Sequence, residues 1–288
     1  MCPNCAVSLT YHQRDRRLKC HYCGHQEKLP ATCPACASGK ITTKGIGTEK
    51  IEEDLGLLLP QAKIHRMDQD TTRAKNAFRN IYQGLKSGEI DILVGTQMLT
   101  KGLDFDNINL AGVLNADQMM YFPDFRAYER TFQLLTQVAG RTGRREKKGK
   151  VLAQTFNPEH YLLQYLKAGD IHGFYSKELE EREKFFYPPF TRLIKLTVKD
   201  KDKLVCDQAA THLANTLGSQ LGKSRVLGPE WPPIERINNF FLKEILLKFE
   251  REKVDVAKAK ILLKSAAFEF SSRKEFRTAQ LIIDVDPY

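Results

Sequence analysis

Residues 137–144 carry two arginines three positions apart, Arg141 and Arg144, next to glycines and after Gln137. An arginine guanidinium keeps its charge and pairs through two N–H groups with phosphate oxygens. A glycine such as Gly140 lets the backbone approach a phosphate where a Cβ atom would collide. This block therefore predicts a site that senses a triphosphate.

An earlier block, residues 95–105, supplies a second group of polar side chains. Thr96, Lys101 and Asp104 follow the apolar run that ends at Val94. Ligands of parallel sheets gather beyond the carboxyl ends of the strands, so a site is expected there. The sequence contains no Gly-x-x-x-x-Gly-Lys-Ser/Thr run to cradle phosphates. The chain is therefore predicted to supply one side of an ATP site without the loop that cradles the phosphates.

Six of the seven cysteines lie in the first 36 residues as three Cys-x-x-Cys pairs. The pairs are Cys2/Cys5, Cys20/Cys23 and Cys33/Cys36. Each spacing bends the backbone so that both thiolates face one point, and two such knuckles complete a tetrahedral zinc site. A short hairpin is expected between the first two pairs, with strands at residues 8–12 and 17–19. The pattern predicts a zinc ribbon.

Six thiolates do not make two four-thiolate sites. The hairpin is expected to bring the first two cysteine pairs together and to leave Cys33 and Cys36 as half a site. His21 or His25 could complete that half. We favour the explanation that a further pair lies upstream of Met1, which predicts one tightly bound zinc per chain.

Length, charge and hydropathy limit the number of domains, the class of partner and the location that can be expected. The 288 residues predict two or three domains, and the net charge of +10 favours a polyanionic partner. No apolar run approaches the roughly 20 residues that span a bilayer, and the N-terminus lacks the apolar core of a signal peptide. The interpretation is a cytoplasmic protein without a membrane partner. In a reducing compartment, paired cysteines more often hold metal than form disulfides.

The middle of the chain alternates predicted strands and helices. Short apolar strands are expected at residues 63–67, 92–94, 110–114 and 151–156. Helices are expected at residues 48–58, 72–85 and 126–138. This alternation predicts a doubly wound parallel sheet, an α/β fold.

A helix at residues 174–185 and Pro188-Pro189 separate a third region. Its predicted strands are residues 193–198, 226–228, 237–249 (a strand or a hairpin) and 279–285. Its predicted helices are residues 203–221, in which Cys206 is a core residue, and 254–268. This order favours a compact α+β domain.

Several motifs occur along the chain in an order that can be compared with known families. They are the cysteine knuckles, Gly45-Ile46-Gly47-Thr48-Glu49-Lys50, Asp68-Gln69-Asp70-Thr71-Thr72, Gly95-Thr96-Gln97-Met98, Pro123-Asp124-Phe125-Arg126 and Gln137-Val138-Ala139-Gly140-Arg141. In this order they resemble the C-terminal part of the PriA family of primosomal replication-restart helicases, over essentially the whole chain. The resemblance implies a zinc-ribbon insert, a RecA-like second motor lobe and a small α+β C-terminal domain. The family also carries one more cysteine pair upstream of the one at Cys2.

The resemblance implies a division into residues 1–42 (zinc region), 43–170 (motor lobe), 171–191 (helical linker) and 192–288 (domain that binds DNA structures). It assigns Arg144 and Arg141 to the γ-phosphate of ATP and Gln137 to nucleotide sensing. The implied nucleotide-binding residues are Gly102, Asp104, Gly140, Arg141 and Arg144. The implied DNA-binding residues are Thr96, Gln97 and Lys101.

By this resemblance the chain is the C-terminal part of an ATP-dependent 3′-5′ DNA helicase that restarts stalled replication forks. Zinc and, in the full-length enzyme, ATP with Mg²⁺ are the expected cofactors. Forked or single-stranded DNA, primosome proteins and single-strand-binding proteins are the expected partners. Two alternatives remain: a non-catalytic zinc-ribbon scaffold that binds DNA or protein, and another superfamily 2 translocase.

Overall fold

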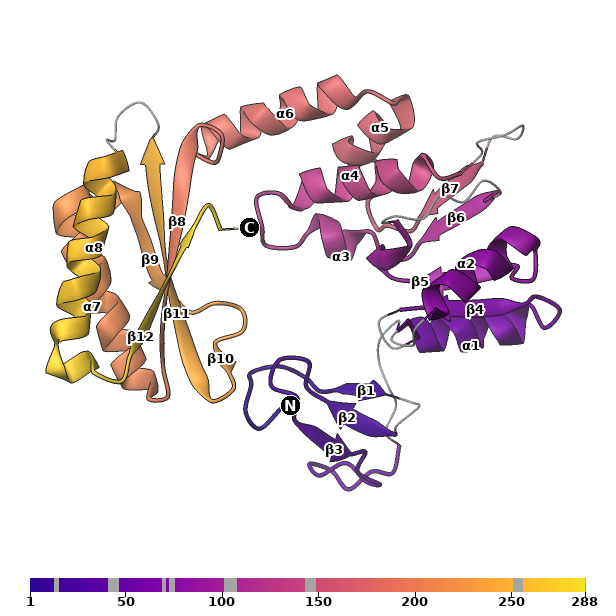
Figure 1. Cartoon of the computed structure of the whole chain (residues 1–288), viewed down its shortest axis with the longest axis horizontal. Helices are drawn as coiled ribbons and strands as arrows, with labels where there is room; N and C mark the ends of the chain where they lie inside the picture. The colour runs from indigo at the N-terminus through magenta and orange to yellow at the C-terminus, as the bar shows by residue number, and fades with distance from the viewer. Residues whose placement is uncertain are drawn as a thin grey trace. The chain divides into compact units, whose positions relative to one another are not determined.

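The computed structural model describes residues 1–12, 16–40, 47–68, 71–72, 76–100, 108–142, 149–250 and 256–287 (Figure 1). The chain forms two compact units, one of residues 1–43 with 180–288 and the other of residues 44–179. Among the described residues, no helix combines the length and apolar character needed to span a bilayer.

A three-stranded antiparallel sheet forms the N-terminal ribbon. Its strands are β1 (Thr10–His12), β2 (Arg17–Lys19) and β3 (Gln26–Lys28), in that order across the sheet. The predicted hairpin of the first two strands is confirmed. The third strand was not predicted, because the polar segment Gln26–Lys28 shows no apolar alternation.

The second unit alternates strands and helices, as the sequence predicts. Its elements are α1 (Thr48–Leu58), β4 (Ile64–Met67), α2 (Ala77–Ser87), β5 (Ile92–Gly95), η1 (Gln97–Thr100), β6 (Leu110–Val113), α3 (Asp117–Met120), α4 (Ala127–Ala139), β7 (Lys150–Ala153), α5 (Tyr161–Ala168) and α6 (Ile171–Lys184). Strand β4 pairs with β5 and strand β6 with β7, both in parallel register. The expected parallel α/β arrangement is confirmed.

Two apolar clusters hold this unit together. Met67 of β4 is buried against Ile81 of α2 and Leu93 of β5. Phe132 of α4 stacks on Phe174 of α6 with 3.9 Å between the ring centroids. Aromatic pairs of this kind add to the free energy gained from burial alone. This packing holds helix α4, which precedes the arginine block, in place within the unit.

One predicted helix boundary was wrong. The apolar spacing predicted a helix over residues 72–85, but α2 begins at Ala77. Asn76 lies before it with a φ of 75°, in the left-handed region that a helix cannot continue through. Periodicity alone does not reveal such a residue.

The C-terminal domain is a five-stranded antiparallel sheet with two helices on one face (Figure 1). Its elements are β8 (Thr191–Asp200), α7 (Lys203–Leu221), η2 (Lys223–Arg225), β9 (Val226–Glu230), β10 (Arg236–Ile237), β11 (Phe240–Glu250), α8 (Val256–Ser272), η3 (Lys274–Phe276) and β12 (Gln280–Val285). The strand order is β10-β11-β8-β12, and β9 also pairs with β11. The predicted α+β order is confirmed.

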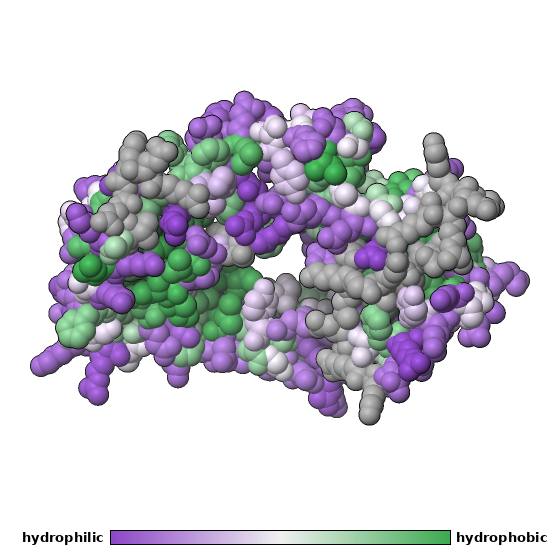
Figure 2. Space-filling view, turned by 45° about the horizontal axis from the view of Figure 1, so that its top comes forward, coloured by the Kyte–Doolittle hydropathy of each residue, from purple (hydrophilic) through white to green (hydrophobic). Residues whose placement is uncertain are grey.

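Alternation along β8 and β11 builds the core of this domain. Leu196 and Val198 on β8, with Ile245 and Leu247 on β11, are fully buried beneath α7 and α8. Cys206 on α7 is 0% exposed among them, as expected of a small core residue. Hydrophobic side chains also reach the surface of the molecule, as the green areas in Figure 2 show; on β12 the exposed ones are Ile282, Ile283 and Val285.

Candidate metal centre and motor motifs

The first two cysteine pairs sit in tight backbone turns at one end of the ribbon. The amide of Cys2 donates to the Val7 carbonyl at 2.8 Å, and the amide of Cys20 donates to the His25 carbonyl at 2.8 Å. Cys20 directly follows strand β2, so the antiparallel sheet carries the second turn to the first. Local spacing and a short sheet thus bring all four thiols to one end of the ribbon.

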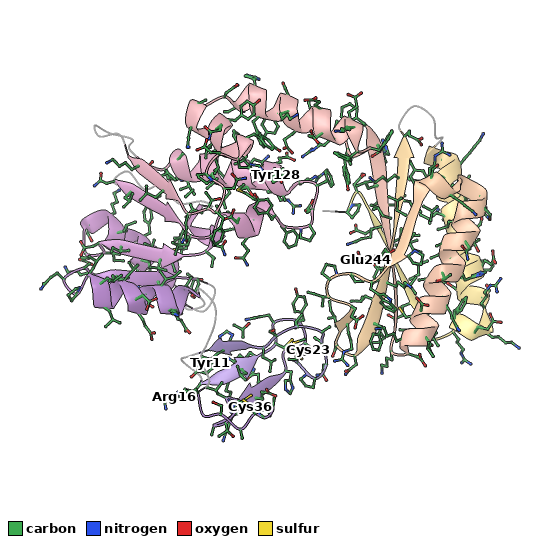
Figure 3. The ribbon with its side chains drawn as sticks, turned by 180° about the vertical axis from the view of Figure 1, so that it is seen from behind. Tyr11, Arg16, Cys23, Cys36, Tyr128 and Glu244 are labelled. Carbon is green, nitrogen blue, oxygen red and sulfur yellow. The ribbon has the colours of Figure 1, made fainter. Side chains whose placement is uncertain are left out.

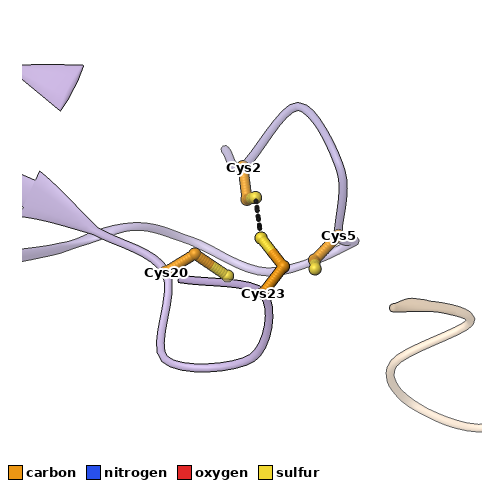
Figure 4. A group of neighbouring side chains, drawn as sticks. All are labelled: Cys2, Cys5, Cys20 and Cys23. Carbon is orange, nitrogen blue, oxygen red and sulfur yellow. Dashed lines mark hydrogen bonds between the residues drawn. The ribbon is translucent and has the colours of Figure 1, made fainter. Parts of the chain in front are cut away.

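The four sulfur atoms of Cys2, Cys5, Cys20 and Cys23 all lie within 4.8 Å of one another (Figure 4). The Sγ atoms of Cys2 and Cys23 are 3.5 Å apart. Tetrahedral zinc with Zn–S bonds of about 2.3 Å separates its sulfurs by about 3.8 Å, so the observed spacing fits a four-thiolate zinc site. The prediction that these four cysteines gather is confirmed.

The electrostatics of the cluster favour a cation. Burial raises the pKa of the Cys5 thiol to about 12 and also raises the pKa of Cys2. The pKa of Cys23 is lowered to about 7, chiefly because the backbone N–H of His25 stabilises its thiolate. Buried thiolates are costly without a counter-charge, and a divalent metal supplies one while it displaces the protons.

A hairpin from the C-terminal domain covers this cluster. The Asn238 amide donates to the Sγ atom of Cys5 at 3.2 Å. The Ala6 amide donates to the Arg236 carbonyl and the Asn239 amide to the Asn4 carbonyl, both at 2.8 Å. Hydrogen bonds to metal-bound thiolates orient the ligands and stabilise their charge.

The sequence analysis did not predict this contact between the hairpin and the cysteine cluster. Asn238 and Asn239 form the two-residue turn between β10 and β11, with φ values of 50° and 65°. Adjacent asparagines between two strands are a hairpin signal, because Asn tolerates the left-handed region. The sequence could thus have given the turn, but not its contact with a segment more than 200 residues away.

The third cysteine pair stays apart from the cluster. Cys33 is half-buried, Cys36 is exposed, and the described residues contain one group with metal-ligand spacing, the four cysteines above. Neither histidine completes the pair. The Nε2 atom of His21 lies 3.4 Å from that of His12, and the Nε2 atom of His25 lies 3.3 Å from Glu27 Oε2.

The predicted DNA-facing residues Thr96 and Gln97 follow strand β5 and are exposed. The Gln97 side-chain amide lies 3.9 Å from the Met119 sulfur. Gly95 immediately before them has no room for a side chain, because a Cβ atom would lie 2.5 Å from the Met67 carbonyl oxygen. The strand end is therefore packed tightly against β4, which fixes where Thr96 leaves the sheet.

The second motif lies at the end of α4. Gln137 and Gly140 are exposed, Arg141 is half-buried, and its amide donates to the Val138 carbonyl at 3.1 Å. Helix α4 lies beside η1, so the two motifs belong to neighbouring elements of one unit. The remaining predicted residues, Lys101, Gly102, Asp104 and Arg144, lie outside the described residues.

Three family models match successive parts of the chain. Residues 2–28 match the PriA DNA helicase Cys-rich region domain, residues 40–146 the helicase conserved C-terminal domain, and residues 183–288 the primosomal protein N C-terminal domain. Together they match the ribbon, the part of the parallel α/β unit up to residue 146, and the antiparallel domain described above.

Curated relatives match most of the chain. The chain is 42% identical over 288 residues to the replication restart protein PriA of Bacillus subtilis, covering 100% of this chain and 35% of the relative. It is 42% identical over 253 residues to that of Synechocystis, covering 86% and 30%, and 36% identical over 291 residues to that of Haemophilus influenzae, covering 99% and 38%. The chain thus spans about a third of the length of these relatives. It belongs to the PriA family of replication restart proteins and corresponds to their C-terminal part.

Proposed function

We propose that this chain is the C-terminal part of an ATP-dependent 3′-5′ DNA helicase that recognises stalled or repaired replication forks and starts primosome assembly. The observation that carries the proposal is positional. One polar motif follows the carboxyl end of β5 and includes η1, the other follows α4, and η1 and α4 are neighbours in one parallel α/β unit. Ligands of such sheets bind at this edge.

In this proposal the arginine block acts on ATP held by a first motor lobe. Arg144 and Arg141 reach the γ-phosphate, where a guanidinium stabilises the charge that develops during hydrolysis. Gln137 senses the nucleotide. Gly102, Asp104 and Gly140 complete this wall of the nucleotide site, with Mg²⁺ bound alongside ATP.

The proposal also assigns the contacts with DNA and proteins. Thr96, Gln97 and Lys101 hold the DNA backbone, Lys101 as a point charge on a phosphate. Forked or single-stranded DNA is the substrate, in the cytoplasm, and primosome and single-strand-binding proteins are the partners. The boundaries at residues 42, 170 and 191 divide the zinc, motor, linker and C-terminal regions.

A chimaera tests the proposal. Residues 1–288 are joined to the N-terminal part of the Bacillus subtilis relative, and DNA-stimulated ATP turnover is measured. We expect Arg144→Ala to lower turnover by roughly 10³-fold, as for other arginine fingers, and Arg144→Lys not to restore it, because the ammonium lacks the planar fork.

The matched control is Arg79→Ala, which removes an exposed arginine on α2. Its turnover should equal that of the unmodified chimaera. Residues 1–288 alone should hydrolyse ATP weakly or not at all, because they contain no Gly-x-x-x-x-Gly-Lys-Ser/Thr run. Unchanged turnover in the Arg144→Ala chimaera, or strong DNA-stimulated hydrolysis by the chain alone, would contradict the proposal.

A further inference from the structure

The two edges of the C-terminal sheet are built differently. Beyond β11, strand β10 has two residues, and β9 contains Gly228-Pro229 and pairs with β11 through a register shift between Glu244 and Leu246. Short strands, proline and bulges protect a sheet edge from pairing with a further strand. At the other edge, β12 runs for six residues without proline or a register shift, and β8 is its one partner among the described strands. This edge is therefore open to a further strand.

The hydrogen-bond alternation shows which backbone groups of β12 face outward. The Asp286 amide donates to the Leu193 carbonyl at 2.9 Å, which continues the pairing of β12 with β8. Backbone groups of successive residues in an antiparallel strand point alternately toward and away from the neighbouring strand. The N–H and C=O groups of Leu281, Ile283 and Val285 therefore point away from β8. The structure shows no hydrogen bond from these groups to another described residue.

The side chains of these residues form an apolar row on the face of the sheet that α7 and α8 cover. They lie opposite core residues of β8, yet Ile283 is 41% and Val285 is 53% exposed. Glu244, labelled in Figure 3, lies on the other face, away from the two helices, and so does Ile282, because both are paired with Thr197. The free edge thus offers outward hydrogen-bond groups together with exposed aliphatic surface.

We propose that β12 pairs antiparallel with β12 of a second copy of this chain, around a two-fold axis at Ile283. In this register Ile283 lies opposite its own counterpart, and Leu281 lies opposite Val285 of the second copy. Every outward N–H and C=O group then gains a partner. The side-chain pairs on the helix-covered face are all aliphatic, which stabilises the pairing. On the other face, Ile282 lies opposite Asp284 of the second copy, so like charges do not meet.

The strand's own sequence favours a second copy as the occupant of this edge. A two-fold interface requires each residue to suit its symmetric counterpart, and the one charged side chain of β12, Asp284, lies off the axis. The other two-fold register, with its axis at Ile282, leaves the outward groups of Val285 unpaired. A single strand pair buries less than the roughly 1,200 Å² of a standard interface, so the association is weak and depends on concentration. The inference goes beyond the proposed function, because it uses none of the motor motifs.

Sedimentation equilibrium of the zinc-loaded chain, over a series of concentrations and with a phosphine reductant present, tests the inference. We expect a reversible equilibrium between monomer and dimer for the wild type. Ile283→Lys should weaken the dimer by at least roughly tenfold, because like charges then lie directly opposite each other at the axis. Ile283→Glu alone should weaken it in the same way. An equimolar mixture of the two variants should dimerise again, because opposite charges then meet at the axis.

Three control variants separate this pairing from other kinds of association. Ile282→Lys should retain the dimer, because its ammonium lies opposite Asp284 of the second copy. Phe268→Lys replaces a 77% exposed aromatic side chain on α8 and should leave the affinity unchanged. Cys36→Ser should dimerise like the wild type, because the pairing does not involve the third cysteine pair.

Four results would overturn the inference. They are a wild type that stays monomeric at every concentration, equal weakening by Ile282→Lys and Ile283→Lys, a mixture of the two Ile283 variants that stays monomeric, and loss of the dimer in Phe268→Lys or Cys36→Ser. Circular dichroism of each variant checks that the sheet has folded. The Arg144 experiment tests the proposed function independently, because it measures ATP turnover.

Discussion

The second and third cysteine knuckles have the same backbone but different environments. In both, the amide of the first cysteine (Cys20 or Cys33) donates to the carbonyl five residues later at 2.8 Å. In both, the residue four positions on has a positive φ, 75° at Gly24 and 55° at Ala37. Yet Cys20, the first cysteine of the second knuckle, is 2% exposed and lies in the metal cluster. In the third knuckle, Cys33 is half-buried, Cys36 is exposed, and both lie outside the cluster.

The difference shows which part of a zinc site is determined by the local sequence. A Cys-x-x-Cys sequence folds its own turn, but a tetrahedral site needs a second turn delivered by other structure. For the second knuckle, the ribbon sheet delivers Cys2 and Cys5. The first knuckle is then covered by the β10–β11 hairpin through the Ala6 amide. The third knuckle has a formed turn without such a partner among the described residues.

The largest expected effect separates the four-cysteine cluster from the third knuckle by metal content. Cys5→Ser should abolish tight zinc binding and unfold the ribbon, because structural zinc contributes about 10–16 kcal/mol of apparent binding free energy in zinc-finger peptides. Cys36→Ser should retain one zinc per chain and the native protease resistance of residues 1–40. Atomic emission spectroscopy after dialysis measures the metal. A second tight zinc in the wild type that Cys36→Ser removes would show that the third pair holds metal in this chain.

The same contrast explains how far the sequence could predict this molecule. Cysteine spacing and a short hairpin are local, so the cluster of Cys2, Cys5, Cys20 and Cys23 was predictable. The hairpin over Cys5 was not, because its contact is set by packing between distant segments. The alternation of buried strands predicted the parallel unit and the C-terminal sheet. The roles of Arg141 and Gln137 stay predictions, since one lobe alone does not test a site shared by two.

A second prediction concerns thiol reactivity in the zinc-loaded chain. Backbone N–H groups of Ala35 and Cys36 stabilise the Cys33 thiolate and lower its pKa, so the reactive thiolate persists as pH falls. Burial raises the pKa of Cys206 to about 11. We expect iodoacetamide to modify Cys33 at least about 10²-fold faster than Cys206 near neutral pH, since each pKa unit changes the thiolate fraction tenfold.

Peptide mapping by mass spectrometry measures both rates. The rate at Cys33 should rise with pH and reach half its maximum below pH 9.0, the ordinary thiol pKa. Modification of Cys5 should stay slow while zinc is present, because metal and the hairpin both cover its sulfur. Alkylation of Cys5 as fast as Cys33 in the zinc-loaded protein would remove the distinction between the metal cluster and the third knuckle.

The smallest expected effect tests the hairpin as part of the metal centre. Asn238 has a φ of 50°, and a β-branched residue there costs about 1–2 kcal/mol. Asn238→Val should therefore loosen the turn, weaken the amide contact with Cys5 and speed zinc release to a chelator by up to roughly tenfold, the rate equivalent of 1.4 kcal/mol. Asn238→Gly keeps both the left-handed turn and the N–H donor, so its release rate should match the wild type. Equal release from all three proteins would mean that the ribbon alone holds the metal. Faster release from Asn238→Val alone would mean that the C-terminal domain is part of the zinc site.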